Sequence, residues 1–429
     1  MDTESGSQYP FQSNLRQLRE HIDLLRPENL GHSSNDHFVL ILRIAGVDKM
    51  INSFNLEIGS QIIDQMADEI RRALRDKDLL LRISDRDFAL ILPAVLDRSL
   101  VQLAANKVLN RISSFCKRNL VGIYRGCIGA TLYPMEGQDS HEVIRSAFMA
   151  MLMAEKSQAP FVEYSPACLE QISQTLLLEE SLINCVANNE LDLVYQPQQC
   201  LKTNRMIGAE VLLRWNRNPK LGSVSPMVFI PLAEQIGFVD ELTNWVLDRS
   251  LNAFLPMQEK FKQFNLSINL SAVSLGRDDL VDHIANSIDL WRVPPQNLTL
   301  EITETAMLDT PDKTREILRQ LKSLGIKISI DDFGTGYSSL AYLNNLPIDE
   351  LKIDKCFTQK LATNENNQRI VKTILSLANN FGLEVVAEGI EDLETLELLQ
   401  AYGCQRGQGY FIARPMEEEA LLNFLRDSD

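Results

Sequence analysis

The stretch IKISIDD, residues 326–332, joins a short apolar run to two adjacent carboxylates, Asp331 and Asp332. An apolar run of this length, preceded by glycine and ended by polar residues, predicts a buried β-strand. Seven other short apolar runs occur in the last 240 or so residues, mostly followed by helical patterns: LDLVYQP (191–197), IGAEVLL (207–213), NLSINLS (265–271), NLTLEIT (297–303), IDELKID (348–354), LEVVAEG (383–389) and GYFIARP (409–415). Eight such repeats predict an α/β fold of the (β/α)8, TIM-like barrel type.

One polar residue stands in or beside each of these runs, mostly towards its C-terminal end. The eight residues are Gln196, Glu210, Asn269, Glu301, Asp331, Lys352, Glu388 and Gln408. In a barrel of parallel strands the C-terminal ends meet at one mouth, which is where active sites of this fold lie. We therefore expect these side chains to lie close together.

Each residue also has a purely structural interpretation. Glu210 could pair with Arg214, Asn269 could cap a turn, and the two adjacent aspartates could cap the loop that follows them. The set is harder to explain in this way. Five carboxylates at one mouth, Glu210, Glu301, Asp331, Asp332 and Glu388, would repel one another strongly without bound cations.

Oxygen-rich sites of this kind select hard cations such as Mg²⁺ or Mn²⁺. Two metals about 4 Å apart can activate a bridging water and stabilise both the attacking and the leaving oxygen on phosphorus. Lys352 could orient that water or neutralise developing charge, and Glu388 could bind metal or accept a proton. A structural salt bridge from Lys352 to Asp354 or Glu350 is the alternative. The pattern thus favours a metal-dependent phosphodiesterase.

The segment that follows Asp331, DDFGTGYSSLAYL at 331–343, places Gly334 and Gly336 among small hydroxyl residues. It has no lysine after the GTG and so is not a P-loop. We interpret it as a mobile lid over the metal site. A glycine-punctuated connection between strand and helix is the simpler alternative.

The charge balance narrows the range of substrates. The 429 residues carry 42 Lys+Arg against 58 Asp+Glu, a formal net charge of -16. Such a chain repels long nucleic acid, although carboxylate-bound metals can still attract a small anion. The seven scattered cysteines, the lack of a signal peptide pattern and the lack of a long apolar segment favour a cytoplasmic protein without a membrane span.

The N-terminal third has a different pattern. Residues 1–36 predict a tail and one short helix near 15–25. Residues 37–164 then alternate between strand and helix patterns, including FVLILRI, LLLRIS and FALILPA, and predict a compact α/β domain. A helix from about 165 to 190 leads into the barrel, so that the second domain spans 165–429.

Several segments of the barrel region match one known signature together: EVLLRW (210–215), YQP (195–197), NLS (269–271), EITE (301–304), DDFGTGYSSL (331–340), LKID (351–354), AEGIE (387–391) and QGYFIARP (408–415). In this combination residues from about 170 to 429 resemble the EAL domain, the cyclic di-GMP phosphodiesterase module. Val211 replaces the alanine of the name-giving motif and leaves Glu210 in place. The resemblance implies hydrolysis of cyclic di-GMP to linear pGpG with two divalent ions, Mg²⁺ or Mn²⁺.

The resemblance also implies a role for each matching position. The metal ligands would be Glu210, Asn269, Glu301, Asp331, Asp332 and Glu388, with Asp331 shared between the two ions. The catalytic positions would be Lys352, which contacts the reacting water, together with Glu388, Gln408 and Glu304, of which Glu304 anchors the DDFGTG loop. Gln196 and Arg214 match substrate-binding positions.

Residues 37–164 resemble a GGDEF, or diguanylate cyclase, domain less closely. The signature reads SDRDF at 84–88 in this chain, so that both glycines are lost and Arg86 replaces an aspartate. The segment LILRIAGVDKMIN upstream offers no acidic residue at the metal-binding position in either of its two registers. We therefore expect an inactive, regulatory domain. Arg75 and Asp78 have the RxxD spacing of the family's product-binding site, and a plain surface ion pair is the simpler interpretation.

Two alternatives remain from the sequence. Tandem proteins of this architecture include non-catalytic cyclic di-GMP receptors that signal by a change of shape, although such receptors typically lose metal ligands that are complete here. A metallohydrolase for another phosphodiester is the second. We also expect a homodimer, and GTP or another nucleotide is a candidate ligand of the first domain.

Overall fold

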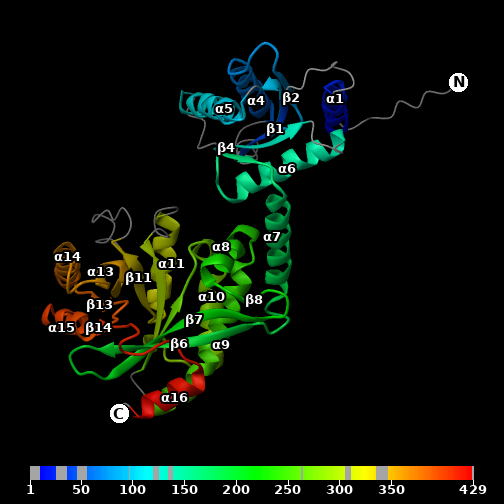
Figure 1. Ribbon diagram of the computed structural model, residues 1–429. Helices are drawn as coiled ribbons and strands as arrows, with labels where there is room; N and C mark the ends of the chain where they lie inside the picture. Colours follow the sequence, from blue (N-terminus) through cyan, green and yellow to red (C-terminus); the bar gives the residue numbers. More distant parts are fainter. Residues whose placement is uncertain are drawn as a thin grey trace. The chain divides into compact units, whose positions relative to one another are not determined.

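The computed structural model describes residues 10–25, 36–45, 56–95, 97–118, 125–133, 139–261, 264–304, 311–334 and 346–427. The chain divides into two compact units, Met1–Leu177 and Leu178–Asp429. The division falls within helix α7 (Pro166–Asn184), whereas the boundary expected from the sequence, between residues 164 and 165, lies just before this helix. Figure 1 labels helices and strands of both units.

The N-terminal unit is a five-stranded sheet in the order β2-β3-β1-β4-β5. Its strands are β1 (Asp36–Ala45), β2 (Leu79–Arg82), β3 (Asp87–Val95), β4 (Arg125–Tyr133) and β5 (Phe161–Glu163). Its helices are α1 (Pro10–Leu24), α4 (Leu56–Arg71), α5 (Ser99–Arg118) and α6 (Ser140–Lys156). The expected α/β pattern of FVLILRI, LLLRIS and FALILPA therefore describes this unit correctly.

Both faces of this sheet are covered, which explains the unbroken apolar run in β1. Leu40 and Leu42 pack in one cluster with residues of α4 and α5. Val39 and Ile41 pack on the other face with residues of α1 and α6. Successive strand residues point to opposite faces, so a strand covered on both sides is apolar at nearly every position.

The C-terminal unit is a closed eight-stranded barrel, as the sequence predicts. The order is β6-β14-β13-β12-β11-β10-β9-β7, and the pairing of β6 with β7 closes it, while β8 (Gly222–Val224) extends β7 outwards. The barrel strands are β6 (Leu191–Cys200), β7 (Met206–Asn218), β9 (Asn265–Asn269), β10 (Leu298–Thr303), β11 (Lys327–Phe333), β12 (Glu350–Ile353), β13 (Glu384–Ala387) and β14 (Arg406–Gly407).

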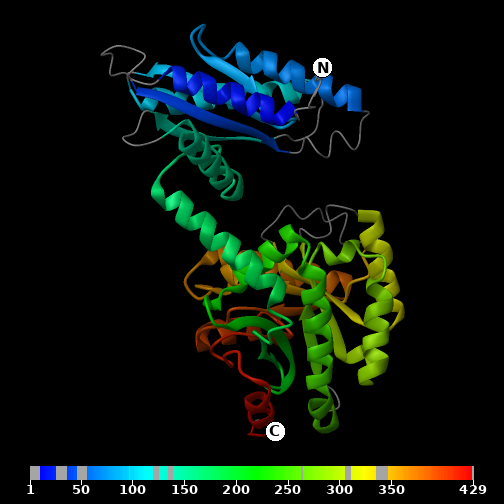
Figure 2. The same ribbon diagram turned by 90° about the vertical axis from the view of Figure 1, so that its right-hand side faces the viewer.

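Helices surround the strands of this unit (Figure 2). They are α8 (Pro226–Ile236), α9 (Val239–Lys260), α10 (Leu280–Trp291), α11 (Pro311–Ser323), α13 (Lys355–Thr358), α14 (Glu365–Phe381), α15 (Leu393–Ala401) and α16 (Glu418–Asp427), with 3₁₀ turns at Ser274–Gly276 and Pro295–Asn297. Among the residues that the structure describes, no helix combines the length and apolarity needed to cross a membrane.

Two features differ from a regular (β/α)8 barrel. Strand β6 runs antiparallel to both of its neighbours and joins β7 as a hairpin, without an intervening helix. The second feature is the short last strand β14, which consists of Arg406–Gly407. The prediction of a strand at 409–415 is therefore wrong. The chain turns there because the carbonyl of Gly409 accepts hydrogen bonds from the amides of Ile412 and Ala413, which closes a tight turn instead of a ladder.

Alternation along the strands separates the outer apolar core from a polar interior. Leu266, Ile268, Leu300, Ile302 and Ile328 lie in the outer core, between strands and helices. Their neighbours along the same strands therefore point into the barrel. The inward positions near the C-terminal ends of the parallel strands β9, β10 and β11 are Asn269, Glu301 and Asp331.

Candidate active site

The ammonium group of Lys352 lies at the centre of the barrel mouth. Its Nζ is 2.6 Å from Glu301, 2.7 Å from Glu388, 3.3 Å from Asp331 and 3.4 Å from Glu210. Lys352 is fully buried, and its four partners come from four different strands or the loops that follow them. The expected cluster of carboxylates is therefore present. The alternative salt bridge of Lys352 with Asp354 or Glu350 is not among these ion pairs.

A chain of amide side chains holds Glu210 from the other side. Gln408 Nε2 donates to Glu210 Oε2 at 2.6 Å and lies 3.0 Å from Gln196 Oε1, while Asn269 Nδ2 donates to Glu210 Oε1 at 2.8 Å. Gln198, which the sequence analysis did not single out, donates to Gln408 Oε1 at 3.1 Å. Antiparallel pairing of β6 with β7 sets Gln196 directly opposite Glu210. Both oxygens of Glu210 are thus fixed in place.

Three of the carboxylates could hold a metal ion together. Glu210, Glu301 and Asp331 each offer an oxygen, and these atoms lie within 4.8 Å of one another. Glu301 is 1% exposed, and its Oε1 is buried without a hydrogen-bond partner. A buried carboxylate oxygen with no partner costs free energy unless a cation or a donor satisfies it. The donor set consists of oxygens only, which fits Mg²⁺ or Mn²⁺.

The excess of negative charge is visible in the pKa values. Burial raises the pKa of Glu301 well above its usual range; Lys352 opposes this, and the nearby Glu210 and Asp331 add to it. Burial likewise raises the pKa of Glu388 to about 7 against the effect of Lys352. Glu210 differs, because Lys352 and the hydrogen bonds from Gln408 and Asn269 outweigh its burial and lower its pKa. One ammonium group does not neutralise this cluster.

Asp332 stands beside the cluster in an unusual backbone conformation. Its φ is 54°, in the left-handed region, and its amide donates to Asp331 Oδ1 at 2.9 Å. Burial, followed by repulsion from Asp331 and Asp354, raises the pKa of Asp332 to about 6. A positive φ is costly for a residue with a side chain, although aspartate tolerates it better than most. The structure thus turns the two adjacent carboxylates to different surroundings.

Glu304 lies at the start of the expected lid. It is 8% exposed, and its Oε2 accepts a hydrogen bond from the amide of Gly334 at 3.1 Å. Gly334 has a φ of 95°, which favours glycine at this position. The rest of the loop, including Gly336, lies outside the described residues, and so does the prediction of a lid.

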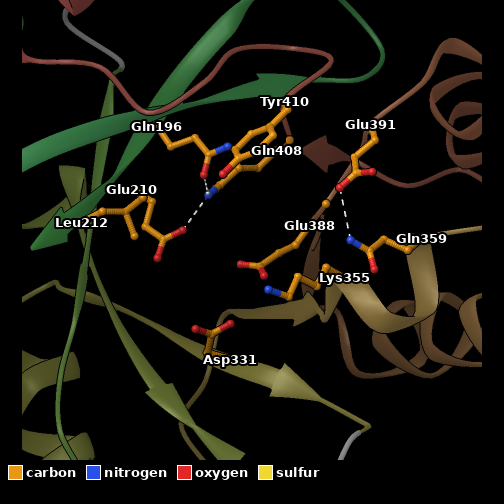
Figure 3. A pocket seen from close by; sticks show the side chains of 12 residues that line it. Gln196, Glu210, Leu212, Asp331, Lys355, Gln359, Glu388, Glu391, Gln408 and Tyr410 are labelled. Carbon is orange, nitrogen blue, oxygen red and sulfur yellow. Dashed lines mark hydrogen bonds between the residues drawn. The ribbon is translucent and has the colours of Figure 1, made fainter. Parts of the chain in front are cut away.

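Above the carboxylates is a cavity of about 430 Å³ (Figure 3). Five of the expected site residues line it: Gln196, Glu210, Asp331, Glu388 and Gln408. Seven further residues line it that the sequence pattern did not single out: Leu212, Lys355, Gln359, Gly389, Glu391, Gly409 and Tyr410. The sequence position of two of them could have indicated their place in the cavity. Lys355 and Glu391 each follow a predicted site residue at the end of a strand by three positions.

Arg214 lies four residues beyond Glu210 on β7. Its Nη1 donates to the backbone carbonyl of Leu213 at 2.9 Å. The partners of Glu210 in the described structure are Lys352, Asn269 and Gln408, so the salt bridge between Glu210 and Arg214 considered above is not formed. Arg214 is not one of the described residues that line the cavity.

The SDRDF segment of the N-terminal unit forms the turn between β2 and β3. Its second acidic residue, Asp87, is 6% exposed and accepts two hydrogen bonds from Arg43, at 2.8 and 3.1 Å. Arg43 also binds Glu155 at 2.8 Å. This bidentate pair uses both oxygens of Asp87.

The RxxD pair of the same unit is also closed on itself. Both Nε and Nη2 of Arg75 donate to the carboxylate of Asp78, at 2.7 to 3.1 Å. Arg75 is about half exposed, with 46% of its side chain accessible, whereas the Asp78 side chain is buried. The geometry matches the surface ion pair considered from the sequence.

Comparisons with known protein families follow the same division of the chain. Residues 178–415, more than half of the chain, match the family model described as EAL domain. Residues 13–159 match the model described as Diguanylate cyclase, GGDEF domain. The order of the two matches is that of the two structural units.

Individual relatives cover most of this chain. The bifunctional diguanylate cyclase/cyclic di-GMP phosphodiesterase MucR of Pseudomonas aeruginosa is 34% identical over 90% of this chain and 56% of its own length. The cyclic di-GMP phosphodiesterase NbdA of the same species is 31% identical over 90% of this chain and 50% of its own length. The chain therefore spans about half the length of these curated relatives.

Solved structures resemble this protein as well. The PaMucR phosphodiesterase in complex with c-di-GMP is 39% identical, with a TM-score of 0.55 over 57% of this chain and 99% of that one. The EAL enzyme Bd1971, in its cAMP and cyclic-di-GMP bound form, is 29% identical, with a TM-score of 0.58 over 80% of this chain and 82% of that one.

Proposed function

Because this chain belongs to the EAL-domain family and carries a GGDEF domain before the EAL domain, we propose that it hydrolyses cyclic di-GMP to linear pGpG in a metal-dependent reaction. The observation that carries the proposal is the cluster of four carboxylates around Lys352 at the floor of a cavity, with Glu301 Oε1 buried and unpartnered. Relatives named as cyclic di-GMP phosphodiesterases support the choice of substrate.

The ligand set of the proposed metal site comes from five elements of the barrel. Its members are Glu210, Asn269, Glu301, Asp331, Asp332 and Glu388. When bound, two Mg²⁺ or Mn²⁺ ions would supply Lewis acidity and a low pKa for the attacking water. The oxygen-only donors, their excess negative charge and the unpartnered oxygen of Glu301 support this assignment.

The remaining side chains would orient and transfer protons. Lys352 is placed to hold the attacking water and to counter negative charge that develops on phosphorus. Glu388, 2.7 Å from Lys352 and on the cavity wall, is placed to take a proton from that water. Gln408 keeps Glu210 in position through its 2.6 Å hydrogen bond. Glu304 would fix the start of the DDFGTG loop through Gly334.

Substrate binding is assigned to Gln196 and Arg214 together with the cavity. Gln196 lines the cavity and is held by Gln408. Arg214 shares the face of β7 that carries Glu210, because residues four apart on a strand point the same way. A guanidinium group is suited to a phosphate or a base edge.

We assign a regulatory, non-cyclase role to residues 37–164. A diguanylate cyclase needs free carboxylates for metal and glycines for close approach of the nucleotide. Here SDRDF lacks the glycines, and Arg43 takes both oxygens of Asp87. GTP or another nucleotide as a ligand of this domain, and a homodimeric state, belong to the same proposal.

Turnover tests the proposal directly. Purified protein is incubated with cyclic di-GMP, with Mg²⁺ or Mn²⁺ or with EDTA, and pGpG is followed by chromatography. We expect pGpG only in the presence of the divalent ion. Absence of turnover together with tight binding that needs no metal would instead establish the non-catalytic receptor. Turnover of a short linear dinucleotide but not of cyclic di-GMP would indicate a different phosphodiesterase.

A further inference from the structure

The cavity above the carboxylates is lined mainly by polar side chains, and it has one aromatic residue. Among the twelve described residues that line it, Tyr410 is the one with an aromatic side chain, and Leu212 is the one large aliphatic residue. Figure 3 shows Tyr410 on the same wall as Gln196 and Gln408. The chemistry of this wall therefore changes from amide to aromatic within two residues of the chain.

Tyr410 exposes a flat surface that most proteins would bury. The residue is 55% exposed, although aromatic side chains usually contribute their area to a core or an interface. The guanidinium carbon of Arg414 lies 4.6 Å from the centroid of its ring, in a cation–π contact. Arg414 covers one face of the ring, and the residue still keeps about half of its surface exposed.

The backbone on either side of Tyr410 is fixed. The carbonyl of Gln408 accepts from the amide of Ile390 at 3.1 Å, and the amide of Phe411 donates to the carbonyl of Ile390 at 3.0 Å. A Cβ on Gly409 would lie 2.2 Å from the backbone of Ile390, so only glycine allows this close approach. Ile390 follows Glu388 by two residues, so these contacts hold the backbone of Tyr410 against the segment that carries the proposed catalytic glutamate.

We propose that Tyr410 is the platform on which one guanine base of the substrate stacks. The inference rests on the proposed function, because that function supplies a ligand with two purine bases. Stacking of a base on an aromatic side chain is a recurrent way for proteins to hold single nucleotides. The polar side chains of the cavity can hydrogen-bond to base edges and phosphate but offer no flat apolar surface. Tyr410 would thus bind the base, while the carboxylates act on the phosphodiester.

The next residue supplies a matched control. Phe411 is also aromatic and 44% exposed, and it belongs to the same turn. It is not one of the described residues that line the cavity. Removal of its ring tests the loss of an exposed aromatic group from this segment without the loss of the proposed platform.

The experiment compares Tyr410→Ala, Tyr410→Phe and Phe411→Ala with the unchanged full-length chain. KM and kcat are measured for cyclic di-GMP and for bis(p-nitrophenyl) phosphate, a phosphodiester without a base. The Kd of cyclic di-GMP is measured by calorimetry with Mn²⁺ in the Glu388→Gln background, which removes the proposed proton acceptor and so slows turnover. Circular dichroism melting confirms that each variant is folded.

Base stacking predicts a selective effect. Tyr410→Ala should raise the KM and Kd for cyclic di-GMP about five- to a hundredfold, a range set by typical base–aromatic stacking, and should leave KM for the base-free ester within about twofold. Tyr410→Phe should restore binding, because the ring is kept. Phe411→Ala should resemble the unchanged chain in both assays.

Three results would overturn the inference: an unchanged Kd for Tyr410→Ala, an equal loss with both substrates, or the same loss for Phe411→Ala. Failure of the proposed function has a different signature. In that case the unchanged chain forms no pGpG, while the Kd series still reports on stacking. If, with Mn²⁺ present, the unchanged chain forms no pGpG and does not bind cyclic di-GMP, both proposals are wrong.

Discussion

Lys352 carries a charge that is expensive to bury and is kept by its surroundings. Removing an ammonium group from water costs several kcal/mol even after relaxation. Burial alone would lower the pKa of Lys352, but the surrounding carboxylates, Asp331 first among them, raise it well above the usual value. The four carboxylates in turn have Lys352 as their shared cation in the described structure. The residue therefore neutralises the site in part before any metal arrives.

Removal of this charge should destabilise the protein when no metal is bound. Lys352→Met leaves buried carboxylates without a counter-ion, and we expect a loss of about 3–5 kcal/mol in the free energy of unfolding in EDTA. Millimolar Mn²⁺ should recover part of that loss, since a ligand that binds only the folded state stabilises it. Urea denaturation with and without Mn²⁺ measures both quantities.

The exposed Lys220 is a control for loss of a lysine from the same unit. Lys220→Met should change stability by less than about 0.5 kcal/mol in either condition. If Lys352→Met were as stable as the unchanged chain in EDTA, the role assigned to its charge would be wrong.

At the scale of elements, short apolar runs were sufficient to predict most of the strands, and the polar residues near their C-terminal ends were sufficient to predict the carboxylate cluster. The runs around Glu301 and Asp331 became β10 and β11, and their apolar neighbours Leu300 and Ile330 point outwards into the cores. The period of two in a strand fixes this geometry locally, so a sequence pattern can reveal it.

Other features depend on contacts between distant segments. The antiparallel direction of β6 follows from its hairpin with β7, which a strand-and-helix count does not detect. The run at 409–415 is apolar enough for a strand but is turned by contacts of Gly409 with Ile390. The pair of Arg43 with Asp87 joins residues 44 positions apart. Such contacts depend on tertiary packing and leave no periodic signal.

A buried ion pair below the cluster links the strands that carry Lys352 and Gln408. Glu350 lies two residues before Lys352 on β12, and Arg406 lies two residues before Gln408 on β14. Arg406 Nη1 is 3.2 Å from Glu350 Oε2, and its Nη2 is 2.5 Å from Glu384 Oε2. Burial raises the pKa of Glu350, and Arg406 opposes that rise. The pair spans the interior of the barrel past β13.

Breaking this pair from one side should be costly. Arg406→Met leaves Glu350 buried without its counter-ion, and we expect a loss of about 3–5 kcal/mol in unfolding free energy. Combining it with Glu350→Gln should recover much of the loss, because the uncompensated charge is then absent. Urea denaturation of the single and double variants measures the coupling. Arg319→Met, which removes an exposed pair with Glu316, is the control and should cost less than about 1 kcal/mol.

An additive double variant would contradict the electrostatic account of Glu350 and Arg406. In that case the loss in Arg406→Met would reflect missing packing of the arginine stem alone.

At the scale of the whole molecule, the net charge of -16 opposes the binding of an anionic dinucleotide. Carboxylates at the barrel mouth add to this repulsion locally. In the proposed function, bound divalent cations would reverse the sign of the field where the phosphate lies. The same argument makes long nucleic acid a poor ligand, because metal at one site does not compensate repulsion along an extended polyanion.

The two-unit organisation also makes a prediction about synthesis of cyclic di-GMP. Incubation of a full-length Glu210→Gln variant with GTP and Mg²⁺ should yield no cyclic di-GMP, because Arg43 takes both oxygens of Asp87. The Glu210→Gln change removes the proposed phosphodiesterase activity, which would otherwise consume the product. Chromatography of the reaction provides the measurement. Accumulation of cyclic di-GMP would show that the GGDEF domain is an active cyclase.

Glu210 provides the most direct test of the whole account, because it is held by Lys352, Gln408 and Asn269 at the proposed metal site. The rate of pGpG formation in Mn²⁺ is compared for the unchanged chain, Glu210→Gln and Glu384→Gln. Melting temperatures of all three proteins show that the variants are folded. Glu384 is the control. It is half exposed and is the first residue of β13, the strand that directly precedes Glu388. We predict that Glu210→Gln lowers the rate at least about a hundredfold, because loss of a residue that only supports a metal ligand already costs up to about that much. Glu384→Gln should change the rate by no more than about threefold. An active Glu210→Gln variant would contradict the account.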